Sequence, residues 1–350
     1  MSVFKEFSIE PPSSPESGDV ITNVKDIVSS GMWANGSGTL SSYYTSSTQS
    51  GSNSAHYLDV YASNPATDSA ARTQFSVTYG HNKGSGSLGE KGVTGTRASA
   101  AIYKQLAMTL LGPNEDKFTF AGDGPHIKPA YVYAISVSRQ QLREKMDPGN
   151  WELHLSGSGT STMKLIDDSG ATANANVNQG GRVFNVISGS ITAGVGEVNT
   201  TAAAQPGGGL GLFYPDLGII VLNGPVIGSV SSASLSASLV SNVEGGNVGK
   251  FYEKIKGGLY FSARREEVIT SQHYFCRIPN KEFNFSSNPS FATASDGTMT
   301  QSTFFKNPKT FITQVGLYND DSELLAVAKL SKPLLKSYSR EAIVKIKLDF

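Results

Sequence analysis

The sequence predicts a mainly β fold with a few short helices (α+β), built from antiparallel sheets or a β-sandwich with an inserted Gly/Ser-rich β lobe. Charged residues make up only 17% of the chain, against about a quarter in typical soluble domains, while Gly, Ser, Thr and Asn are abundant. Short runs rich in β-branched and aromatic residues recur between Gly, Asn, Asp and Pro. The segment Ala342–Phe350 alternates apolar and charged residues, which is typical of a half-buried strand.

Residues 1–18 are predicted to form an extended N-terminal arm, because three prolines exclude this segment from a helix or a central strand. A helix is predicted over residues 20–30. Asp19 can cap it, apolar residues follow at helical spacing, and Gly31 ends it.

The clearest helical pattern is Arg97–Leu111, in which small and apolar residues share one face before Gly112 and Pro113 end the helix. A short helical pattern also covers Arg139–Met146. Apolar runs around these helices predict strands over residues 73–79, 117–120, 131–137 and 151–155.

Residues 156–245 are predicted to form an inserted β-rich lobe, because the composition shifts there toward Gly, Ser, Ala, Asn and Thr and charge becomes scarce. Short apolar segments remain inside it and predict strands at 163–166, 183–187, 210–214 and 218–222. Strand patterns then resume at 252–261 and 268–277. The main β-rich domain is therefore expected to consist of residues 19–155 and 246–350.

A β-hairpin is predicted near the C-terminus. Phe311–Tyr318 and Leu324–Leu330 are apolar runs, and Asn319 to Ser322 between them supply the polar residues of a tight turn. Upstream of the hairpin, the loop at 280–291 carries Phe283, Phe285 and Phe291. An aromatic loop of this kind is rarely left in water, so we expect it either to contact a partner or to cover its own core.

The charge balance favours protein partners over nucleic acid or membrane. Lys plus Arg and Asp plus Glu both number 29, so the formal net charge is zero. A neutral surface has no electrostatic attraction to phosphate backbones or anionic lipids, and it lacks the self-repulsion that keeps proteins monomeric. The N-terminus has no signal-peptide pattern, and no apolar stretch is long enough to span a membrane. We therefore expect a homo-oligomer made and assembled in the cytoplasm.

No motif in the chain supports catalysis or a cofactor. Residues 84–89 satisfy G-x-G-x-x-G, but loop-forming residues follow where a dinucleotide site needs a helix, so a surface loop is expected. The five histidines show no metal-ligand spacing. Asp167-Asp168 precedes Ser169-Gly170, which is typical of a turn rather than an acid pair. The single Cys276 lies in an apolar run, where we expect a small buried hydrophobe. We predict no enzymatic activity, cofactor or metal.

The segment Ile312–Tyr318 followed by Glu323–Ala328 resembles the E-x-G-L-F-x-x-x-G-x-L-L-A-V-A hairpin of the N-terminal attachment domain of phage tail-collar fibre proteins. Tyr318 stands where that pattern has Phe, and Ser322 where it has Gly. The chain as a whole resembles a family of virion structural proteins of T4-like myophages, including cyanophages, on the segments Asp147–Leu153, Gly211–Asn223 and Tyr274–Phe291.

This resemblance implies a structural subunit of a contractile-tailed virion, in the baseplate or at a fibre-attachment point, that binds other tail proteins. Two alternatives remain: a peripheral receptor- or glycan-binding virion protein using loops of the inserted lobe, and a neck- or head-associated structural protein. Apolar side chains of the arm, the aromatic loop and the hairpin are the interface candidates, namely Phe4, Phe7, Phe283, Phe285, Phe291 and Tyr318.

Overall fold

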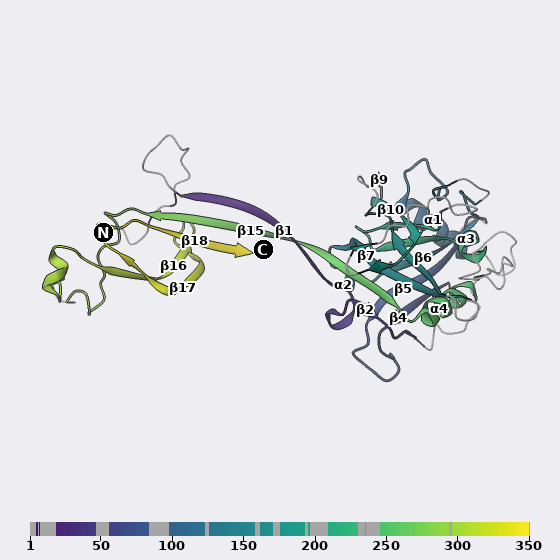
Figure 1. Cartoon of the computed structure of the whole chain (residues 1–350), viewed down its shortest axis with the longest axis horizontal. Coiled ribbons are helices and arrows are strands. Elements are labelled where there is room, and N and C mark those ends of the chain that lie inside the picture. The colour runs from purple at the N-terminus through teal and green to yellow at the C-terminus, as the bar shows by residue number, and fades with distance from the viewer. Residues whose placement is uncertain are drawn as a thin grey trace. The chain divides into compact units, whose positions relative to one another are not determined.

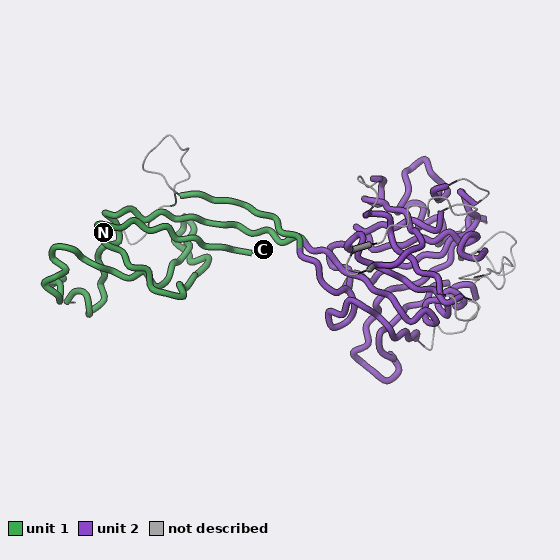
Figure 2. Tube along the Cα trace, viewed as in Figure 1, with its two compact units in different colours: residues 1–27, 268–350 green, residues 28–267 purple. Residues whose placement is uncertain are grey.

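A computed structural model describes residues 5, 7, 19–46, 56–83, 98–122, 126–157, 162–170, 176–192, 195–196, 209–229, 235, 246–293 and 296–349. The chain divides into two compact units, shown in different colours in Figure 2. Unit 1 contains residues 1–27 and 268–350, and unit 2 contains residues 28–267. The chain passes from one unit to the other twice, within β1 (Val20–Gly31) and within β15 (Phe261–Ile278).

Unit 2 is built on one large sheet (Figure 1). Its hydrogen-bonded order is β15–β7–β8–β10–β13–β14–β6–β5–β4–β3, and every pair with a defined register is antiparallel. The strands are β3 (Tyr44–Thr45), β4 (Tyr57–Tyr61), β5 (Thr73–His81), β6 (Tyr131–Val137), β7 (Lys145–Ser156), β8 (Thr162–Asp167), β10 (Gly181–Ser188), β13 (Gly211–Tyr214) and β14 (Ile219–Asn223).

The smaller elements of unit 2 lie around this sheet. β2 (Thr39–Leu40) pairs with β15, β9 (Asn176–Asn178) pairs with β10, and β11 (Ile191–Thr192) pairs with β12 (Val195–Gly196). The helices are α1 (Ala98–Leu110), α2 (Arg139–Leu142), α3 (Gly224–Ser229), α4 (Gly246–Gly258) and the 3-10 turn η1 (Ala34–Gly36).

The sheet of unit 2 is apolar on both faces, and a helix packs on each. On one face, α4 contacts β4, β5 and β7, and the ring of Phe251 lies 4.9 Å from that of Tyr133. On the other face, Tyr103 of α1 is buried in a second cluster with Val132 and Val221. Because successive side chains of a strand point to opposite faces, strands covered on both sides are nearly continuously apolar, as β6 is.

The mainly β prediction is confirmed, as are the helix at 97–111 and the strands at 73–79 and 131–137. The predicted helix at 20–30 is wrong, because its β-branched residues form strand β1. The predicted strand at 252–261 is also wrong. Its first residues belong to α4, where Val248, Phe251, Tyr252 and Ile255 are buried at helical spacing.

Two shorter predictions also needed correction. Residues 117–120 form no strand, although Phe118 and Phe120 are buried. The helix predicted over 139–146 ends at Leu142, and the chain enters β7 at Lys145.

The structure divides the chain at places other than the predicted domain boundaries. The described strands within residues 156–245 do not form a separate lobe, because β8, β10, β13 and β14 lie between β7 and β6 in the same sheet. The apolar segments of this region pair directly with strands from the flanking sequence, for example Leu153 with Leu165 and Ile220 with Ile135. The units separate instead at residues 27/28 and 267/268.

Unit 1 contains the predicted C-terminal strand and hairpin, both confirmed. β18 (Ala342–Asp349) pairs antiparallel with β15, and β1 neighbours β15 in the same sheet. The hairpin consists of β16 (Thr310–Tyr318) and β17 (Leu324–Lys336), and it packs beside β15 and β18 (Figure 1). The buried residues of this small core are Ile278, Ala342, Val344 and Ile346, joined by half-buried side chains of the hairpin and by Cys276. Burial raises the pKa of the Cys276 thiol, as expected of a packed cysteine.

Two residues of the predicted arm are described, and both contact unit 1. The ammonium of Lys5 lies 2.8 Å from Oδ1 of Asp19 and also donates to the carbonyl of Arg277. The ring of Phe7 packs edge-on against Tyr274, 5.9 Å away. Asp19 therefore does not cap a helix. Its buried carboxylate accepts hydrogen bonds from Lys5 and, at 2.7 Å, from the backbone N–H of Arg277.

We predict that Asp19→Ala destabilises unit 1 by about 1–3 kcal/mol, because the N–H of Arg277 and the ammonium of Lys5 both lose their carboxylate acceptor. Chemical unfolding followed by circular dichroism measures the loss. Asp26→Ala, on the exposed part of β1, is the control and is expected to change stability by less than about 0.5 kcal/mol. Equal stabilities of the two variants would show that the contact contributes nothing.

Candidate protein–protein interface

Exposed apolar side chains gather in unit 1. Unit 2 is the larger unit and holds most of the described buried apolar side chains, yet most of the described large apolar side chains that reach solvent belong to unit 1. The exposed members in unit 1 are Val20, Val24, Ile27, Phe283, Phe285, Phe305, Phe311, Tyr318, Leu324, Leu325, Val327, Tyr338 and Ile343. A unit with a small core and a large apolar surface is typical of a protein that binds other proteins.

The β16–β17 hairpin carries large apolar side chains on both faces. Its inner face carries Ile312, Val315, Leu317, Ala328 and Leu334, which pack into the core of unit 1. Its outer face carries Phe311, Leu325 and Val327, which are 62%, 67% and 58% exposed. Tyr318 and Leu324 complete this outer face at the turn end. We call Phe311, Tyr318, Leu324, Leu325 and Val327 the outer face of the hairpin.

Gly316 shapes the middle of the outer face. It pairs with Val327, and a Cβ atom placed on it would lie 2.9 Å from Cε2 of Tyr318 and 3.1 Å from Cδ1 of Leu324. The tyrosine ring and the leucine side chain therefore reach over the glycine, into the space that a larger side chain would fill. Together they place apolar atoms next to Val327, which pairs with Gly316.

One of the three interface candidates in the aromatic loop at 280–291 is buried. Phe291 is only 5% exposed, with its ring 5.1 Å from Phe304 and 5.5 Å from Phe285. The prediction that Phe291 is an interface residue is therefore wrong, because its ring packs inside its own loop. Phe283 and Phe285 are 40% and 41% exposed.

Lys336 anchors the start of this loop. Its buried ammonium donates to the carbonyl of Asn280 at 2.8 Å and to Oδ1 of Asn284 at 3.2 Å, and it also reaches the carbonyl of Ser337. Burial lowers the pKa of Lys336. The loop is thus tied at its base to the last residue of β17.

We predict that Phe291→Ser lowers the free energy of unfolding by about 3 kcal/mol, because it empties the centre of the loop cluster. Phe285→Ser is the matched variant. It removes a ring that is already half in water, and we expect less than about 1 kcal/mol. Thermal unfolding of both variants measures the difference. A larger loss for Phe285→Ser would make it, not Phe291, the packing residue.

The remaining interface candidates lie outside the aromatic loop. Tyr318 is at the turn end of the hairpin, and Phe7 is half-buried against Tyr274. Phe4 lies outside the described residues. Sequence analysis missed Phe311, Leu324, Leu325 and Val327. The signal that could have found them is the run Leu324–Val327, in which four consecutive apolar residues place apolar side chains on both faces of the strand.

Strand β1 also exposes apolar side chains. Val24, Ile27 and Val28 reach solvent, and Ile27 and Val28 are consecutive, so they point to opposite faces of the strand. This stretch of β1 therefore has solvent on both faces.

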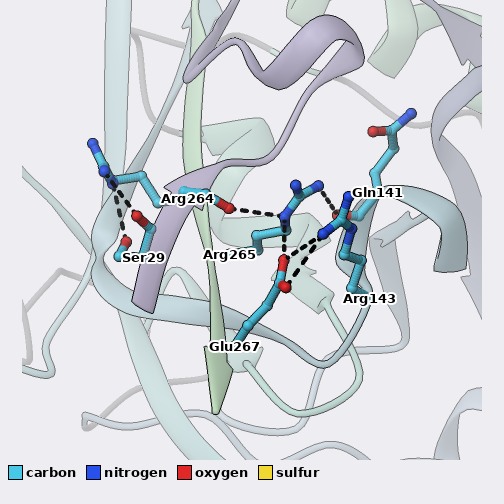
Figure 3. A network of polar contacts seen from close by, with 7 residues as sticks. Ser29, Gln141, Arg143, Arg264, Arg265 and Glu267 are labelled. Carbon is cyan, nitrogen blue, oxygen red and sulfur yellow. Dashed lines mark hydrogen bonds and ion pairs between the residues drawn. The ribbon is translucent and has the colours of Figure 1, made fainter. Parts of the chain in front are cut away.

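A polar network in unit 2 fixes the strands that lead out of it (Figure 3). Arg264 donates to Oγ and the carbonyl of Ser29, at 3.0 and 3.2 Å. Nε of Arg265 lies 2.7 Å from the carboxylate of Glu267, and Arg143 donates to the same carboxylate at 3.1 Å. This network ties the end of β1 to the start of β15, and it ties β15 to the chain just after α2. The arginine pair at 264–265 thus makes its contacts within unit 2.

Two buried carboxylates of unit 2, Glu152 and Asp167, are engaged in local structure. The buried carboxylate of Glu152 accepts from Oγ of Ser190 at 3.1 Å and from the N–H of Ile191 at 2.7 Å, and it contacts Nε2 of His154 at 2.5 Å. Asp167 is likewise buried and accepts from the N–H groups of Gly149 and Ser169, as expected of a turn. Burial raises the pKa of Asp167.

Within the described ranges, no group of three or more His, Cys, Asp or Glu side chains is arranged to hold a metal ion. No helix in the same ranges is long and apolar enough to cross a membrane. The G-x-G-x-x-G segment at 84–89 lies outside the described residues.

Searches for similar proteins found no matching family model, no matching curated protein and no matching solved structure.

Proposed function

We propose that this chain is a structural subunit of a contractile-tailed phage particle, in the baseplate or at a fibre-attachment point, and that it acts by binding other proteins of the tail. The observation that carries the proposal is the exposed apolar surface of unit 1. The resemblance of Ile312–Ala328 to the tail-collar fibre hairpin supports the same role, because the resemblance lies in the hairpin that bears part of that surface.

The two units differ in core size and in exposed apolar surface, and this difference fits an assembly role. Unit 2 has a large core, helices on both faces of its sheet and few exposed apolar side chains. Unit 1 has a core of a few buried residues and an open apolar hairpin face. Burying such surface against another protein stabilises the unit and the complex together.

The test is the composition of purified particles of the phage that encodes this chain. We expect quantitative mass spectrometry to find the chain in gradient-purified virions, in multiples of three or six copies per particle, and in isolated tails after heads and tails are separated. A phage protein made in the cell but not built into particles serves as the control. Absence of the chain from virions, or its recovery with heads alone, would contradict the proposal.

A further inference from the structure

We propose that the outer face of the β16–β17 hairpin binds the same face of a second copy of this chain, with the two hairpins antiparallel about a twofold axis. The inference rests on the proposed assembly function and names the first partner of that surface. It starts from the two-faced apolar character of the hairpin. Strands with apolar side chains on both faces are normally covered on both, and among the described residues the core of unit 1 covers only the inner face.

The exposed area is of the size that a weak dimer needs. A Phe or Tyr side chain buries about 150–250 Å², so the five partly exposed residues of the outer face present on the order of 500 Å² of apolar surface per copy. Two such faces bury on the order of 1,000 Å², which is the lower limit for a specific interface. Interfaces at this lower limit are typical of weak, transient complexes, so we expect a reversible dimer with a dissociation constant in the micromolar range.

Charges on the hairpin favour a second copy as the occupant. The turn end is acidic, with Asp320, Asp321 and Glu323 all exposed. The other half is basic, with exposed Lys329 and Lys332 on β17. In an antiparallel stack, the acidic turn of each copy lies over the basic half of the other. Each contact then occurs twice, as a twofold interface requires.

The open edge of unit 1 is a poorer candidate for this contact. β18 is hydrogen-bonded to β15, and its outward residues include Lys345 and Lys347. Lysines on an edge strand oppose pairing with another copy of the same strand, because antiparallel self-pairing brings like charges together. The face of the hairpin, not the edge of β18, is therefore the surface that a second copy covers.

The test is the oligomeric state of the purified full-length protein, measured by sedimentation equilibrium from about 1 to about 200 μM, a range that brackets the expected affinity. We expect the wild type to form a reversible dimer. Val327→Asp, at the centre of the outer face, is expected to weaken it at least about ten-fold. Ile343→Asp is the matched control, since Ile343 is at least as exposed as Val327 but lies on β18, and it should leave dimerisation unchanged. Leu325→Lys is the second outer-face variant should Val327→Asp fail to fold.

Charge reversal tests the antiparallel geometry. Asp321→Lys and Lys329→Glu should each weaken the dimer, and the double variant should recover much of the loss, because the opposite charges then meet again across the axis. A wild-type protein that stays monomeric over the whole range, a trimer, or a dimer unaffected by Val327→Asp and Leu325→Lys would overturn the inference. Finding the chain in virions while the purified protein is monomeric would contradict the dimer alone. A dimeric chain absent from virions would contradict the proposed function alone.

Discussion

Replacing Ile346 by alanine should unfold unit 1 at temperatures where unit 2 stays folded. Ile346 is 5% exposed, and it is one of only a few buried side chains in the core between β15, β18 and the hairpin. Truncating a buried isoleucine costs about 2–5 kcal/mol. A unit with so small a core has little stability to lose. Scanning calorimetry should show one transition moving down by many degrees.

The same strand supplies the control. Ile343 is three residues earlier and 66% exposed, so Ile343→Ala should shift neither transition by more than about 0.5 kcal/mol. The pair separates burial from any general effect of shortening a side chain on β18. Equal effects of the two variants would contradict the assignment of faces on this strand.

Replacing Trp33 by alanine should cost unit 2 about 3–5 kcal/mol, and it should move the other calorimetric transition. The indole is almost fully buried, with its ring 4.8 Å from that of Phe261 and 5.9 Å from that of Phe75. Its Nε1–H also donates to the carbonyl of Phe261 at 2.8 Å. The substitution therefore opens a cavity and removes a buried hydrogen bond at once.

Two control variants separate the contribution of the hydrogen bond from that of the buried ring. Trp33→Phe keeps much of the ring but leaves the carbonyl of Phe261 without its donor, and we expect about 1–3 kcal/mol. Met108→Ala, at an exposed position of α1, should change stability by less than about 0.5 kcal/mol. Trp33→Ala and Ile346→Ala should act on different transitions, because the hydrophobic clusters that contain them share no residue. A single transition that responds to both variants would show that the units unfold together.

Regular alternation made parts of the fold predictable. β18 alternates along its whole length because one face is covered and the other is in water, and the hairpin is marked by a polar turn between two apolar runs. β1 lacked this signal. Because both of its faces reach solvent along much of its length, its apolar residues do not alternate, and the spacing of Val20, Val24, Ile27 and Val28 also fits a helix.

The candidate interface was less predictable than the fold for a related reason. The sequence does not distinguish Phe285 from Phe291, whereas in the structure Phe291 lies between the rings of Phe285 and Phe304, which comes later in the chain. Large apolar residues lie on both faces of the hairpin, and the register shifts between Ile312 and Gln314 and between Leu317 and Tyr318 interrupt the alternation, so spacing alone does not assign the covered face. The sequence could show that the hairpin needs cover on both faces, but only the packing identifies the uncovered one.

The double passage of the chain between the units has a consequence for the order in which they form on the ribosome. Unit 2 is continuous in sequence, so it can fold as soon as residue 267 has left the ribosome, whereas unit 1 needs segments from both sides of unit 2. β1 is made early but must wait for β15 and β18 before the sheet of unit 1 exists. The hairpin follows unit 2 in the chain, so its exposed outer face is completed only after unit 2 has left the ribosome. Unit 2 can then already be folded, which limits the period in which nascent chains can associate prematurely.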